Sequence, residues 1–121
     1  MRNRILNNKT TKDFFIKHLI DFYPDVNEFI LKEVKVNYIY QNKVKTDRVD
    51  SISYKVIDNL FYDTFTVKVY QDKPIITQKD LDNREDNVYV SFPLEHTVVS
   101  LYAIEYGIVK VSIVAPDIEI I

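Results

Sequence analysis

Apolar and polar residues alternate in several segments of this chain, and this period of two constrains the fold more than any other feature. In residues 33–40 the even positions hold Val34, Val36, Tyr38 and Tyr40. Successive side chains of a β-strand point to opposite faces, so the alternation predicts a strand with one buried face. Residues 52–57 and 65–70 repeat the pattern and are predicted to be two further strands.

Three segments in the second half of the chain also predict strands. Residues 88–92 alternate and end at Pro93, whereas residues 98–106 and 108–115 flank Gly107, the only glycine of the chain. A turn residue between two strand-like runs is typical of a β-hairpin. About six strands therefore follow one another without alternating helices, which favours an antiparallel sheet over a β-α-β fold.

A longer period occurs near the N-terminus. Phe15, Leu19 and Phe22 lie at positions i, i+4 and i+7, followed by Pro24. This spacing predicts an amphipathic helix over residues 11–22, because proline cannot continue a helix.

Shorter helical segments are predicted at residues 25–31 and around residues 79–81. Together these elements predict an α+β fold, in which the N-terminal helix packs on a curved, mostly antiparallel sheet or small β-barrel. The whole chain, residues 1–121, is expected to be one domain with a β body over residues 33–116. The isoleucines at the C-terminus predict an apolar tail that docks at a site the sequence does not define: Ile118, Ile120 and Ile121.

The composition excludes several classes of site. The chain contains no cysteine, so neither a disulfide nor a thiolate site is possible. Glycine-rich phosphate loops need several glycines, and one glycine does not provide them. We find neither a signal peptide nor a run of about 20 apolar residues that would cross a membrane, and we expect a cytoplasmic protein without cofactors.

Charge is distributed unevenly along the chain. Residues 1–60 hold 11 Lys or Arg against 8 Asp or Glu, whereas residues 61–121 hold 5 against 10. Within the first half, basic residues accompany tyrosine on the predicted strands, as in proteins that stack single-stranded bases on aromatic rings. The candidate nucleic-acid contacts are Lys35, Tyr40, Lys43, Lys45, Arg48 and Lys55. The alternative interpretation places Tyr38 and Tyr40 in the core, on the same face as Val34 and Val36.

The second half contains an acidic cluster that is a candidate partner-binding site: Asp80, Asp82, Glu85 and Asp86. It does not match a calcium-binding EF-hand loop, because Glu85 and Ser91 stand at the sixth and twelfth positions in place of glycine and glutamate. The two histidines, His18 and His96, are interpreted as surface residues. No serine lies in a nucleophile elbow, and we expect a protein that is not an enzyme.

The strand-like segments have a layout similar to that of a known family. Thr46-Asp47-Arg48 leads into Ile52–Val56, and Thr66–Val69, Val88–Phe92 and Val111–Ala115 follow. Over about residues 46–118 this layout resembles small accessory proteins of integrative conjugative elements in Gram-positive bacteria, the group that includes helicase-processivity factors. The resemblance implies a role in element DNA replication or transfer, through single-stranded DNA or a helicase or relaxase partner. No catalytic residue is implied.

Two other functions are compatible with the same residues. A small phage or mobile-element inhibitor, for example an anti-CRISPR protein, would block a nucleic-acid enzyme with the acidic cluster. A structural module that forms homodimers is the third possibility.

Overall fold

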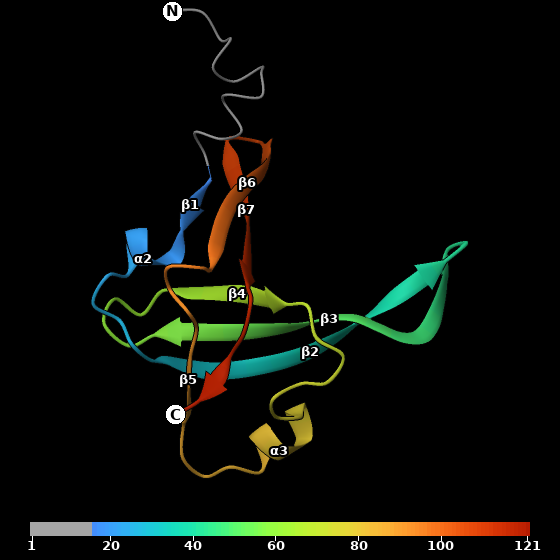
Figure 1. Ribbon diagram of the computed structural model, residues 1–121, viewed down its shortest axis with the longest axis horizontal. Coiled ribbons are helices and arrows are strands. Elements are labelled where there is room, and N and C mark those ends of the chain that lie inside the picture. Colours follow the sequence, from blue (N-terminus) through green and yellow to red (C-terminus); the bar gives the residue numbers. More distant parts are fainter. Residues whose placement is uncertain (1–15) are drawn as a thin grey trace, which may run out of the picture.

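Strands dominate the computed structural model, which describes residues 16–121, with residues 101–105 and 109 described by their backbone only. The described strands form one mixed sheet in the order β1-β6-β7-β4-β3-β2-β5-β8 (Figure 1). Their bounds are β1 Lys17–His18, β2 Phe29–Gln41, β3 Val44–Asp58, β4 Thr64–Val69, β5 Val88–Ser91, β6 Val98–Glu105, β7 Ile108–Ala115 and β8 Glu119–Ile120. Two short helices accompany them in this part of the chain: α2 Leu19–Phe22 and α3 Gln78–Asp82.

The predicted α+β class and the predicted helix over residues 11–22 are wrong. Residues 11–15 of that helix lie outside the described residues, and the remainder forms β1 and the single turn α2. The backbone N–H of Leu19 donates to Thr97 O at 2.8 Å, and that of Ile20 donates to Leu94 O at 3.1 Å. Because these amides bond to another segment, the helical spacing of the apolar side chains does not produce a longer helix.

The second predicted helix, residues 25–31, is also wrong. Its last three residues begin β2, where Phe29 and Leu31 are buried and Ile30 between them is half-buried. They pair with β5, with Phe29 opposite Val90. Three apolar residues in succession fit a strand with neighbours on both edges as well as they fit a helix.

The six predicted strands are confirmed, and the sheet has two further strands, β1 and β8. These edge strands contain two residues each, too few to show an alternating pattern. One pair, β4 with β7, is parallel, so the sheet is mixed. The sheet bends strongly, and β1, β6 and β7 rise across β2, β3 and β4 (Figure 1).

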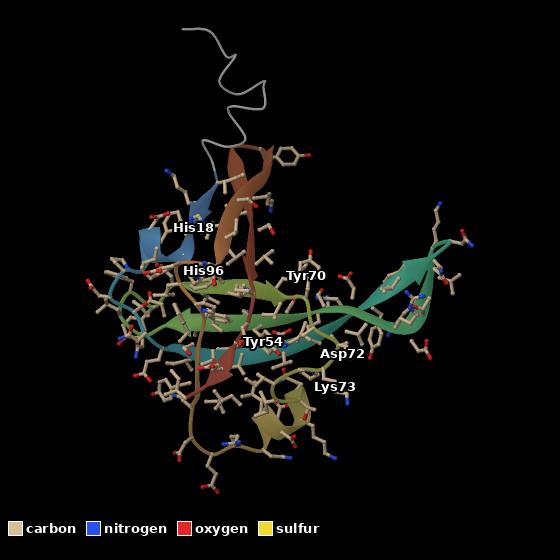
Figure 2. The ribbon with its side chains drawn as sticks, viewed as in Figure 1. His18, Tyr54, Tyr70, Asp72, Lys73 and His96 are labelled. Atoms are coloured by element: carbon tan, nitrogen blue, oxygen red, sulfur yellow. The ribbon has the colours of Figure 1, made fainter. Side chains whose placement is uncertain are left out.

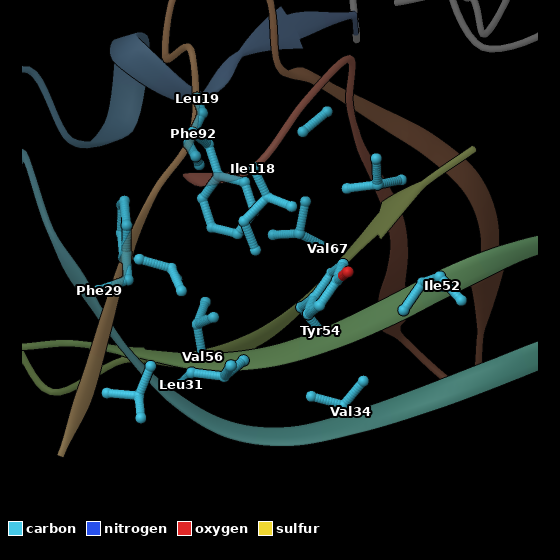
Figure 3. Packing of buried hydrophobic residues seen from close by; sticks show 14 of the residues in the cluster. Leu19, Phe29, Leu31, Val34, Ile52, Tyr54, Val56, Val67, Phe92 and Ile118 are labelled. Atoms are coloured by element: carbon cyan, nitrogen blue, oxygen red, sulfur yellow. The ribbon is translucent and has the colours of Figure 1, made fainter. Parts of the chain in front are cut away.

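The core lies on the inner face of this bent sheet (Figure 3). Phe29 of β2 and Tyr54, Val56 and Val67 of the adjacent strands are completely buried there. Burying one large apolar side chain stabilises a fold by about 1.5–3 kcal/mol. Ile118 is also buried, which confirms that the C-terminal tail docks, and the pairing of β8 with β5 shows where it does so.

A β-bulge in β2 adjusts which side chains reach the core. Pairing with β3 passes from Leu31 to Glu33, which leaves Lys32 as the extra residue. Leu31 and Val34 therefore both point inward although they are three residues apart. The amide of Val34 donates to the Gln78 side chain at 2.6 Å, which attaches α3 to the sheet.

The predicted helical turn near residues 79–81 is confirmed by α3. Its N-cap, Thr77, accepts a hydrogen bond from the Asp80 amide at 3.1 Å. Among residues 16–121, no helix has the length and apolar character needed to cross a membrane.

Candidate nucleic-acid interface

The β2–β3 hairpin extends beyond the core. We call its outer part, residues 38–48, the arm. Pairing continues to the end, with Gln41 opposite Val44, while residues 40–45 are exposed. In Figure 1 the arm projects to the right, away from the other strands. It is therefore a strand pair without a packed layer over its tip.

The turn at the tip of the arm has two residues in the left-handed region. Asn42 has a φ of 52° and Lys43 a φ of 68°. Positive φ at both central positions characterises the type I′ turn, whose twist matches that of the flanking strands. Asparagine is common there, but lysine stands where glycine is usual. The turn thus holds the Lys43 side chain at the tip at some cost in backbone strain.

Two tyrosines and a lysine share one face of the arm. Tyr40 lies opposite Lys45 in the β2–β3 register, and the Lys45 ammonium lies 4.2 Å from the centroid of the Tyr38 ring. Such cation–π contacts orient the charge over the ring. The Tyr40 side chain is 64% exposed, so its interpretation as a core residue is wrong.

The other two cations predicted for this region, Lys43 and Arg48, are exposed on the same arm. Asp47 is the acidic residue among them. The Arg48 amide donates to Thr46 Oγ1 at 3.3 Å, and that hydroxyl in turn donates to Ile39 O. The bond from Thr46 to Ile39 joins the two strands where their register shifts, and the bond from Arg48 to Thr46 holds the backbone of Arg48 in place.

The structure places Lys35 and Lys55 apart from the arm, on the outer face of the sheet. Lys35 is five residues from Tyr40 along β2, a distance of about 17 Å at the usual rise of a strand. Lys55 lies opposite Glu33. Both lysines line an open depression of about 240 Å³, together with Glu33, Asn37, Ser53 and Thr66.

Hydrogen bonds organise the floor of this depression. Asn37 donates from Nδ2 to Ser51 Oγ at 3.1 Å and to Ser53 Oγ at 2.8 Å. Ser51 donates in turn to the Asp50 carboxylate at 3.0 Å. The amide of Asn37 is thereby fixed between two strands, and the lysines stand on either side of a polar surface.

The set of predicted residues omits two that the sheet brings to this face. Lys68 pairs with Ser53 across β3 and β4, and its ammonium lies 5.8 Å from the ring centroid of Tyr70. Tyr70 is exposed at the end of β4 (Figure 2). The alternation of residues 65–70 already marked Lys68 and Tyr70 as outward-facing, but only the strand order shows that Lys68 lies diagonally across from Lys55.

The predicted acidic cluster lies elsewhere, on α3 and the loop that follows it. Its four carboxylates are exposed: Asp80, Asp82, Glu85 and Asp86. Asp82 accepts a hydrogen bond from Gln78 Nε2 at 2.8 Å. Lys79 and Arg84 are exposed among these residues and reduce the negative charge of the segment.

The two histidines are exposed, which confirms their interpretation as surface residues. They lie on neighbouring segments, because His18 pairs with Val98 and His96 precedes that strand (Figure 2). In the described part of the chain, no group of three or more histidine or carboxylate side chains is placed to hold a metal ion.

Comparison with known proteins identifies no relative: neither a protein-family model, nor a curated protein, nor a solved structure matches this chain.

Proposed function

We propose that this chain binds single-stranded nucleic acid through the arm. Tyr40 provides an exposed ring on which a base stacks, and Lys43, Lys45 and Arg48 contact phosphates. The observation that carries the proposal is the shared face of Tyr40 and Lys45, with the Lys45 ammonium held over Tyr38. Rings beside cations suit single strands because every base has a π-face and every nucleotide a phosphate.

The outer face of the sheet offers a second cationic surface, on the face opposite to that of Tyr40 and Lys45. Lys35, Lys55 and Lys68 stand there around Asn37 and its two serine partners, with Glu33 as an opposing charge. Amide and hydroxyl groups commonly contact phosphate and sugar, which positions the nucleic acid without reading its sequence. We therefore expect weak sequence preference.

The proposal includes a non-enzymatic accessory role in mobile-element DNA replication or transfer, and this part rests on the sequence resemblance alone. In that setting a helicase or relaxase would be a partner. The alternative function, an inhibitor of a nucleic-acid enzyme, would use the acidic segment of α3. The interspersed Lys79 and Arg84 weaken that segment as a mimic of nucleic acid, so we favour the arm.

Fluorescence anisotropy of a labelled thymidine oligonucleotide with the full chain tests this function. Tyr40→Ala should weaken binding about tenfold, since one stacked base contributes about 1–3 kcal/mol. Lys45→Ala with Arg48→Ala should weaken it further and reduce the slope of log K against log salt by about 1.4.

Matched controls separate the arm from general surface effects. Tyr106→Ala removes an exposed tyrosine of the β6–β7 turn, and Lys79→Ala removes an exposed lysine of α3. Both variants should bind like the parent. Anisotropy that stays flat at low salt contradicts the proposal, and so does an equal loss in the control variants.

A further inference from the structure

A second exposed apolar surface lies at the end of the molecule opposite the arm. We call it the acidic aromatic end, formed by Phe22 of α2 and by Leu60, Phe61 and Tyr62 of the β3–β4 turn. These four side chains are 53–76% exposed. Four large apolar side chains grouped in this way are more than the scattered apolar residues of an ordinary surface.

The turn that presents them is tightly held. The carboxylate of Asp58, which is completely buried, accepts hydrogen bonds from the amides of Leu60 at 2.7 Å and Phe61 at 3.1 Å. The Tyr62 amide donates to Asp58 O at 2.9 Å, and Tyr62 has a φ of 61°. A left-handed tyrosine is strained, and such strain persists only where surrounding bonds fix the backbone. The backbone of the turn is therefore fixed, and it presents Leu60, Phe61 and Tyr62 to the solvent.

Tyr23 joins α2 to this turn. Its hydroxyl donates to the Asp63 carboxylate at 2.9 Å, and its ring lies 6.4 Å from that of Phe61. The same ring stacks on Phe65 at 5.5 Å, which anchors the arrangement to the core. Phe22 directly precedes Tyr23, so its backbone is held next to the β3–β4 turn.

The charge of this surface is of one sign. Residues 19–31 and 56–67 contain no lysine or arginine. Three exposed carboxylates accompany the aromatic side chains: Asp21, Asp25 and Asp63. A partner segment that combines apolar side chains with lysine or arginine would complement it.

The arm of this same chain has that chemistry. Tyr40 and Val44 are 64% and 65% exposed there, beside Lys43, Lys45 and Arg48. Figure 1 places the arm and the β3–β4 turn at opposite ends of the longest axis of the molecule. One chain therefore cannot bring its own two surfaces together.

We propose that the acidic aromatic end binds the arm of a second copy, so that copies associate head to tail. Such a contact joins two different surfaces and leaves one of each free, which allows further copies to add. A hairpin tip against a turn is small, and interfaces below about 1,200 Å² are typically transient. Association should therefore depend on concentration and weaken as salt screens the charges.

Sedimentation velocity of the full chain from micromolar to millimolar concentration tests the association. The weight-average mass should rise with concentration at an ionic strength of about 0.01 M and fall back towards the monomer at about 1 M. A chain that stays monomeric throughout overturns the proposal and leaves the surface to a different protein.

Two variants test the head-to-tail geometry. Phe22→Ser with Leu60→Ser changes only the acidic aromatic end, and Lys45→Glu with Arg48→Glu changes only the arm. Each should be monomeric alone, but their equimolar mixture should form a heterodimer, because each variant retains the surface that the other lacks. Ile108→Ser, on the exposed start of β7, is the matched control and should associate like the parent.

Other results contradict the geometry. Association that survives in one of the two variants shows a contact between like surfaces, and a mixture that stays monomeric excludes the arm as the occupant. Thermal unfolding of each variant checks that it is folded. The variant of the acidic aromatic end keeps the arm intact, so it should still bind the oligonucleotide. A failure of self-association is thereby distinguished from a failure of nucleic-acid binding.

Discussion

The inner and outer halves of the β2–β3 hairpin both pair as strands, but their aromatic side chains differ in burial. In the inner half, Phe29 of β2 and Tyr54 of β3 are completely buried under the bent sheet. In the outer half, which is the arm, Tyr40 continues the same alternation but is exposed. Strand pairing extends through both halves, so the backbone hydrogen bonds do not explain the difference.

The difference arises from what lies opposite each half. The inner half faces the strands β6 and β7 and the C-terminal tail, whose Ile118 and Ala115 are buried against it. The arm extends past these elements. An alternating pattern therefore identifies which side chains share a face of the sheet. Which part of that face is buried depends on how far the other strands extend over it.

Truncating one aromatic side chain in each half should give the largest difference in the free energy of unfolding. Phe29→Ala should lower the free energy of unfolding by about 3–5 kcal/mol, because it leaves a cavity among packed rings. Tyr40→Ala, on the exposed arm, should change it by at most about 0.5 kcal/mol. Urea denaturation followed by circular dichroism measures both values. A loss of similar size in both variants would show that the arm is packed in solution.

The same reasoning explains how much of the fold the sequence predicts. Strands β2, β3, β4 and β5 follow from alternation, because each has buried apolar side chains on one face and enough residues to show the pattern. Strands β6 and β7 follow instead from the two strand-like runs on either side of Gly107. The edge strands β1 and β8 do not, since two residues carry no period. The parallel pairing of β4 with β7 depends on the bend of the sheet and leaves no local pattern.

The wrong prediction of a helix over residues 11–22 has a different cause. Leu19 and Phe22 have helical spacing, yet Leu19 is buried beside β6 and Phe22 is exposed. Spacing predicts a helix only where the backbone amides find partners within the segment, and here they bond to Thr97 and Leu94.

The candidate site was predictable in part. The structure places Lys43, Lys45 and Arg48 together on the exposed arm, but sequence could not separate them from Lys35 and Lys55. The acidic aromatic end was not predicted, because Leu60, Phe61 and Tyr62 look like core residues until the Asp58 turn directs them outward. Exposure of apolar residues is a property of the folded chain.

The next largest effect should be a loss of stability at alkaline pH that arises from Tyr54 in the inner half of the hairpin. Burial raises the pKa of the Tyr54 phenol, although the hydrogen bond donated by the Ile75 amide opposes this shift. The folded chain thus favours neutral Tyr54, and this stability is fully present below the unfolded pKa of about 10. As the pH rises above about 10, only the unfolded chain loses the proton and stability falls.

Tyr54→Phe tests this dependence. The variant should be less stable near neutral pH by about 1–2 kcal/mol, because it leaves the Ile75 amide and the Gln71 side chain without their partner. Its stability should then fall less steeply above pH 10 than that of the parent, as measured by urea denaturation. Parallel curves would show that Tyr54 does not contribute to the alkaline transition.

The smallest effect should come from the tip of the arm. Lys43→Gly relieves the positive φ of Lys43 and completes an Asn-Gly type I′ turn, which is the favoured sequence there. It should strengthen pairing in the arm by at most about 1 kcal/mol. Because the arm extends beyond the core, we expect it to open without unfolding the core, and hydrogen exchange of the arm amides then measures this change better than global denaturation. We expect slower exchange confined to the arm, because glycine stabilises the turn, together with weaker binding of the oligonucleotide, because the Lys43 charge is lost. The two results together would separate the effect of turn geometry from that of charge. Slower exchange in β2 and β3 under the core would instead show that the two halves of the hairpin open together.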